Sequence, residues 1–86
     1  MPYIRKEDRE YIDAGLAVVT GRINTAGELN YTIVQLIQSW LKRNGGVSYS
    51  NLNSIHGVLS CVDKEIYRRV TAPYEDQKSK ENGDVF

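Results

Sequence analysis

The chain has 86 residues, 41% of them hydrophobic and 26% charged, which argues against a disordered or fibrous protein and predicts one small globular domain. Eleven basic and eleven acidic residues cancel, so we expect no overall attraction to nucleic acid or to an anionic membrane. A single cysteine, an opening segment without the apolar core of a secretory signal, and no run approaching about 20 apolar residues predict a cytoplasmic protein that does not cross a membrane.

The first predicted helix runs from about Lys6 to Ile23. Its apolar residues recur at steps of four, three and four, which places them on one face of a 3.6-residue spiral: Ile12, Leu16, Val19 and Ile23. Gly15 and Gly21 each cost about 1 kcal/mol against alanine in a helix interior. We therefore expect this helix to be the weakest, and either glycine marks a close helix contact or an early end.

The second predicted helix begins with a capping box, in which Thr25 is followed three residues later by Glu28. Glu28 would repel an anion at this helix start, so a structural cap is preferred over a phosphate site. The helix is expected to end at Asn44–Gly46, because asparagine and glycine tolerate a left-handed backbone. Its apolar stripe is wider than one neighbouring helix would cover: Leu29, Ile33, Val34, Leu36, Ile37, Trp40 and Leu41.

The third predicted helix has Ser48 or Ser50 as its N-cap. Its apolar residues follow steps of three, four, three, four and four, close to a heptad repeat: Leu52, Ile55, Leu59, Val62, Ile66 and Val70. We expect it to end near Ala72, because Pro73 restricts the residue before it and donates no backbone hydrogen bond.

These elements predict an all-α protein, a three-helix bundle formed by residues 1–73 with an extended C-terminal tail at residues 74–86. The tail is polar until Val85 and Phe86, yet these residues and Tyr74 are apolar anchors that predict docking on the bundle or on a neighbouring subunit. The stripes also predict a homo-oligomer and one common core containing five apolar side chains: Leu36, Trp40, Leu59, Val62 and Ile66.

Four segments carry a resemblance to a known family: MPYIRKEDR at the start, GELNY at 27–31, YRRVTAPYED at 67–76 and KENGDVF at 80–86. On these segments the chain resembles a family of short proteins of unknown function encoded by phages, prophages and their bacterial hosts. The resemblance implies an origin in a mobile element and a tail that belongs to the ordered or recognising part of the protein. It implies no cofactor and no catalytic residue.

Carboxylates offer the nearest approach to catalytic chemistry. Glu10 and Asp13 form an ExxD pair of the kind that holds magnesium in helical nucleotide pyrophosphohydrolases. Such a site needs acidic residues from a facing helix, and Asp63 and Glu65, two apart, lie on different faces. His56 and Cys61 are likewise not on one helix face, so no zinc site or nucleophile is expected.

The candidate ligand-binding residues are Arg68, Arg69, Tyr74 and Lys80. Paired guanidinium groups match phosphate or carboxylate, and a tyrosine ring stacks on a base. The slightly favoured alternative is an internal salt bridge from the arginines to tail carboxylates, namely Glu75, Asp76 or Asp84.

The function expected from the sequence is that of a non-catalytic, phage-like binding protein, possessing no metal or cofactor. It would bind or sequester a host protein or a small anionic, nucleotide-type ligand, as a counter-defence protein does. The alternative is a small metal-dependent nucleotide hydrolase that uses four carboxylates: Glu10, Asp13, Asp63 and Glu65.

Overall fold

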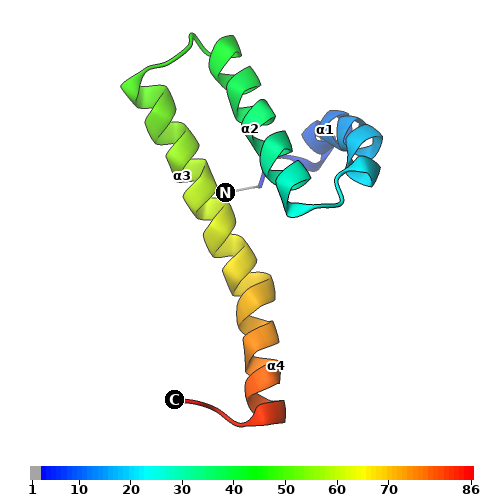
Figure 1. The fold of residues 1–86 in the computed structure, drawn as a ribbon. Coiled ribbons are helices and arrows are strands. Elements are labelled where there is room, and N and C mark those ends of the chain that lie inside the picture. Colours follow the sequence, from blue (N-terminus) through cyan, green and yellow to red (C-terminus); the bar gives the residue numbers. More distant parts are fainter. Residues whose placement is uncertain (1–2) are drawn as a thin grey trace. The chain divides into compact units, whose positions relative to one another are not determined.

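The computed structural model describes residues 3–86, which form helices joined by short turns, without a strand among them (Figure 1). This confirms the all-α class. The chain divides into two compact units, one ending at Leu52 and one running from Asn53 to Phe86. None of the described helices combines the length and the apolar character that crossing a bilayer demands.

Helix α1 extends over Lys6–Val19 and is followed by a 3₁₀ turn at Thr20–Arg22. It therefore ends earlier than its apolar spacing predicts, and the early end lies at Gly21, as the cost of glycine in a helix suggested. At the other end, the Arg5 Nε donates to the Asp8 carboxylate at 2.9 Å. This ion pair is exposed and contributes little to stability.

Helix α2, Ala26–Arg43, begins with the predicted capping box. The Glu28 amide donates to the Thr25 hydroxyl at 3.1 Å, and the Glu28 carboxylate accepts from the Thr25 amide at 2.9 Å. The Asn24 amide donates to the same carboxylate oxygen at 3.0 Å. These bonds satisfy amides that have no partner within the helix.

The connection from α2 to the next helix confirms a second prediction. Gly45 and Gly46 have φ angles of 94° and 86°, and the Gly46 amide donates to the Leu41 carbonyl at 2.7 Å. Only glycine adopts such angles at little cost. The Asn51 side chain donates to the carbonyls of Asn44 and Gly46, each at 2.9 Å, which fixes the turn against the following helix.

Helix α3 spans Tyr49–Ile66, a π-helical turn spans Tyr67–Thr71, and α4 spans Ala72–Asn82. The Asn51 amide donates to the Ser48 hydroxyl at 3.0 Å, so Ser48 is the predicted N-cap. The three segments follow one another as a single helical run of 34 residues (Figure 1). The sequence expectation that the helix ends near Ala72 is therefore wrong.

Pro73 is accommodated because it lies in the first turn of α4, directly after the π turn. A proline in a helix lacks an amide hydrogen and collides with the carbonyl four residues before it. In the π turn the Ala72 amide donates to the Tyr67 carbonyl, five residues back. This wider turn shifts the hydrogen-bond pattern just before the ring, and the residues expected to be an extended tail continue as helix.

The end of α4 is set by Gly83, whose φ of 85° is compatible with glycine. The Phe86 amide donates to the Asp84 carboxylate at 2.9 Å. Val85 and Phe86, the expected apolar anchors, are fully exposed. Docking of this segment stays a prediction.

The common core expected from the stripes would combine side chains of both units, so its packing stays a prediction. Among residues 3–86 no side chain is buried. The five side chains expected to pack together are exposed by 39% to 60%: Leu36, Trp40, Leu59, Val62 and Ile66. Amphipathic spacing identified the faces correctly as apolar, but it does not say which chain covers them.

Candidate binding site

An apolar surface lies along α3 and its continuation through the π turn into α4. Leu59 is 39% exposed, Val62 and Ile66 are each 54% exposed, and Val70 and Tyr74 are about 60% exposed. A contiguous apolar face of this kind marks an interaction surface.

The π turn keeps this face continuous. From Val62 the apolar residues recur at intervals of four, at Ile66, Val70 and Tyr74. Four residues overshoot one α-helical turn by about 40°, whereas a π turn holds more than four residues. Because Tyr67–Thr71 are π-helical, Val70 and Tyr74 stay on the face of Ile66.

Arg68 and Arg69, two of the predicted ligand-binding residues, both donate to Glu65. The Arg68 Nη2 lies 3.0 and 3.2 Å from the two carboxylate oxygens, and the Arg69 Nε contacts Oε1. The bonds from Arg69 and from Arg68 hold the pKa of Glu65 below its ordinary value. The arginines thus form an internal salt bridge with Glu65, which is not one of the tail carboxylates named in the favoured alternative.

Sequence reasoning looked for that partner in the tail, at Glu75, Asp76 or Asp84. Glu65 precedes Arg68 by three and Arg69 by four residues, and these spacings place side chains next to each other on a helix. The helical spacing was therefore the available signal. The guanidinium groups remain accessible, since the side chains of Arg68 and Arg69 are 65% and 57% exposed.

Tyr74 and Lys80 lie further along the same helical run. The Lys78 ammonium is 5.7 Å from the centre of the Tyr74 ring, and it forms an ion pair with Glu81 at 3.2 Å. Lys80 is in the last turn of α4, where a positive charge is favoured. A helix rises about 1.5 Å per residue, so about 18 Å of helix separates Arg68 from Lys80.

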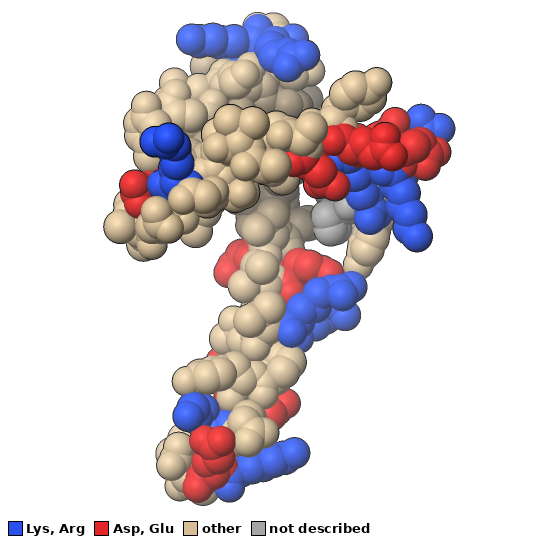
Figure 2. Space-filling model, turned by 90° about the vertical axis from the view of Figure 1, so that its right-hand side faces the viewer, with Lys and Arg blue, Asp and Glu red and all other residues tan. Residues whose placement is uncertain are grey.

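The charges of the chain are mixed in sign. On the face drawn in Figure 2, blue and red atoms touch at several places, and uncharged surface lies between these clusters. Along the helical run Tyr49–Asn82, here called the α3–α4 rod, residues 63–82 hold five acidic and five basic side chains. Acidic and basic side chains therefore alternate along this part of the chain.

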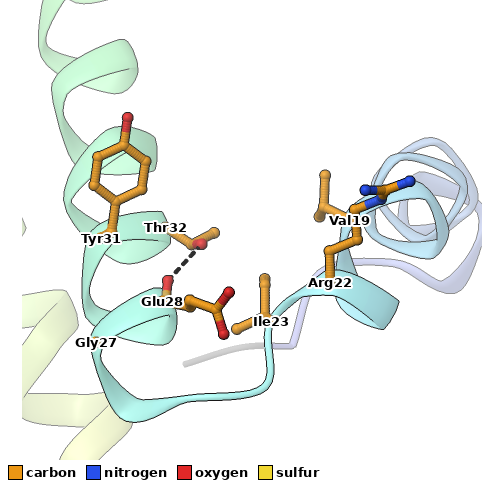
Figure 3. A pocket seen from close by; sticks show the side chains of 7 residues that line it. All are labelled: Val19, Arg22, Ile23, Gly27, Glu28, Tyr31 and Thr32. Atoms are coloured by element: carbon orange, nitrogen blue, oxygen red, sulfur yellow. Dashed lines mark hydrogen bonds between the residues drawn. The ribbon is translucent and has the colours of Figure 1, made fainter.

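A hollow of about 400 Å³ lies where the chain passes from α1 into α2 (Figure 3). Its lining combines apolar residues with one arginine and one carboxylate: Val19, Arg22, Ile23, Gly27, Glu28, Tyr31 and Thr32. The amides of Asn24 and Thr25 and the Thr25 hydroxyl hold the pKa of Glu28 below its ordinary value. The helix start is thus already occupied by a carboxylate, as the capping box predicted.

A second hollow, of about 640 Å³, is lined by residues of α1, of the C-terminal half of α2 and of its C-cap: Ile12, Leu36, Ser39, Trp40, Arg43 and Asn44. Trp40 is 41% exposed, and Leu36 is 60% exposed. Both hollows are open to solvent. Sequence reasoning did not anticipate either one, because their walls come from side chains on different helices.

The carboxylates of the hydrolase alternative are not gathered into a metal site within the described residues. Within residues 3–86, no group of three or more His, Cys, Asp or Glu side chains is arranged to hold a metal ion. Glu65, one of the four, accepts hydrogen bonds from two arginines. Cys61 is a free thiol of intermediate exposure.

Comparison with known proteins identifies the family of the chain. No curated protein and no solved structure matches the chain. A family model matches residues 1–85, which is nearly the whole sequence. The chain therefore belongs to the family described as "Domain of unknown function (DUF6899)".

Proposed function

We propose that this chain is a non-catalytic binding protein of phage or prophage origin that acts by capturing a partner protein of the host cell, as a counter-defence protein does. The observation that carries the proposal is the exposure of its apolar helix faces. Large apolar side chains stay exposed on both long helical segments, including Leu36 on α2 and Val70 on the π turn. Surface of this kind is stable in water only when something covers it.

The shape of the hollows supports binding over catalysis. Enzymes accelerate reactions with preorganised polar groups in a site from which water is excluded. The two hollows are open, and the carboxylate in the first one is engaged as a helix cap. The segments that resemble phage and prophage proteins support the proposed origin.

The test compares two variants of α2. Leu36→Asp places a charge on the apolar face, whereas Gln38→Asp places the same group two residues on, about 200° around the helix. Each protein is expressed in the host, purified, and weighed by native mass spectrometry. We expect the wild type and Gln38→Asp to retain one host component in fixed stoichiometry and Leu36→Asp to lose it.

The hydrolase alternative has its own readout in the same samples. Magnesium-dependent turnover of a nucleotide panel by the wild type, abolished by Asp13→Asn, would contradict the proposal. A purified wild type that carries no component besides copies of itself would contradict it as well.

A small anionic ligand of nucleotide type is the second candidate, because Arg68 and Arg69 present two accessible guanidinium groups beside one carboxylate. A phosphate competes for the same donors as the Glu65 carboxylate. If it binds there, Glu65→Gln should raise nucleotide affinity in calorimetry, and Arg69→Gln should remove binding.

A further inference from the structure

Four charged residues of the α3–α4 rod are placed symmetrically about the point between Thr71 and Ala72. Asp63 and Glu65 stand eight and six residues before Thr71, and Lys78 and Lys80 stand six and eight residues after Ala72. A second copy of the rod, turned end for end about the point between Thr71 and Ala72, therefore brings its lysines to the level of these acids. The pattern is self-complementary, as a two-fold interface requires.

The positions of these charged residues around the helix axis are compatible with this pairing. Relative to the face of Ile66 and Tyr74, the helical repeat places Asp63 and Lys78 on one flank and Glu65 and Lys80 on the other. In a two-fold antiparallel pair, each flank meets the same flank of the other copy. Each acid then lies within two residues, about 3 Å of rise, of the level of a lysine on its own flank.

The apolar residues between the flanks meet in the same register. Val70 comes to within one residue of the level of the partner's Tyr74, and both side chains are about 60% exposed in the single chain. The overlap runs from Cys61 to Asn82, about six helical turns. It brings the partner's Val85 and Phe86, which follow Asn82, towards the level of Leu59.

The helical run that carries this surface is long. Tyr49–Asn82 has 34 residues and is about 51 Å long. Its second half, from Ile66 onward, carries exposed apolar side chains, among them Val70 and Tyr74.

We propose that the α3–α4 rod is a homodimerisation surface, on which a second copy of this chain packs antiparallel with Asp63 and Glu65 beside the partner's Lys78 and Lys80. The apolar face supplies the attraction, and the flanking charges set the orientation and the register. The interface uses a different helical segment from the α2 face that is proposed to capture a host protein. It leaves the outward side of the rod, where Asp76 lies, open to solvent.

Two charge-reversed variants test the arrangement. Variant one carries Asp63→Lys and Glu65→Lys, so all four of these flank positions are basic. Variant two carries Lys78→Glu and Lys80→Glu, so all four are acidic. Like charges then face each other in each homodimer. We expect each variant alone to dimerise at least tenfold more weakly than the wild type in sedimentation equilibrium. An equimolar mixture should regain the dimer, because every pair is then opposite in sign.

The mixture also guards against a trivial failure to fold, since a misfolded variant is not rescued by a second one. Native mass spectrometry should show one copy of each variant in the restored dimer, at about twice 9.8 kDa. The matched control, Glu10→Lys with Asp76→Lys, changes the net charge as much as variant one and should dimerise like the wild type. The proposal is overturned by a monomeric wild type, by variants that dimerise unaltered, or by a mixture that stays monomeric.

Discussion

At the scale of single residues, the sequence predicted local hydrogen bonding well. The capping box of Thr25 and Glu28 and the cap at Ser48 are present as expected. Such motifs depend on residues three positions apart, so the sequence alone is enough to locate them. Glu65 also lies three residues from Arg68, but it was not predicted as its partner. The C-terminal tail was expected to fold back and to supply the carboxylate instead.

The capping box makes a first prediction. Thr25→Ala removes the oxygen that accepts the Glu28 amide, and loss of a helix cap typically costs about 1 kcal/mol. The midpoint of urea unfolding, followed by far-ultraviolet circular dichroism, should fall accordingly. Thr32→Ala is the control, because its hydroxyl only donates back to the Glu28 carbonyl, and it should change stability by less than about 0.5 kcal/mol.

The Glu28 carboxylate makes a second, pH-dependent prediction. Hydrogen bonds hold its pKa in the folded chain below the ordinary 4.5, so the folded state favours the charged form. Its contribution to stability is complete above pH 4.5 and is lost as the pH falls through the lowered pKa. In acid titrations of melting temperature, Glu28→Gln should be less stable than the wild type at neutral pH, and the two curves should converge in acid. Parallel curves would contradict this role.

At the scale of elements, periodicity predicted the helices correctly. It predicted the residues at which they end less well. Gly21 and Gly45 act as expected, whereas Pro73 does not stop the helix. Proline is compatible with a helix when the preceding turn is widened, and the sequence contains a trace of this in the repeated four-residue steps from Val62 to Val70. A rule based on single residues cannot register such a step pattern.

A third prediction concerns two glycines whose replacement by alanine should change stability in opposite directions. Gly45 has a φ of 94°, so Gly45→Ala forces an unfavourable backbone and should destabilise by about 1 kcal/mol or more. Gly15 lies within α1, and a Cβ there meets nothing within 4 Å, so Gly15→Ala should stabilise by up to about 1 kcal/mol. Denaturant unfolding of both variants checks the pair, and equal effects would show that backbone geometry does not decide them.

At the scale of the whole molecule, the sequence predicted apolar faces but not what covers them. The common core of Leu36, Trp40 and Leu59 was expected because a lone chain was assumed to bury its own stripes. The spacing of apolar residues shows which side chains share a face. It does not show whether that face packs on its own chain or on another copy. The candidate binding residues were identified as a cluster in sequence, and a straight helical run spreads them along its axis.

The C-terminal segment makes a fourth prediction at this scale. Deleting residues 83–86 removes Val85 and Phe86 and leaves α4 intact. If these anchors pack on the partner beyond Asn82, dimerisation should weaken at least tenfold in sedimentation equilibrium, whereas Asp84→Asn should leave it unchanged. Equal dimerisation of the deleted and complete chains would show that the end of the chain is not part of the interface.

The central claim, an antiparallel pair of rods, is tested most directly by a disulfide. In a Cys61→Ser background, one protein carries Val62→Cys and another carries Glu81→Cys, two positions on the proposed seam that lie at equal distances from its centre. The antiparallel pair predicts a crosslink when the two are mixed under mild oxidation and none in either protein alone, since like positions are then about 28 Å apart along the axis. Crosslinking of each protein with itself, as parallel rods would give, or none in the mixture, would contradict the account.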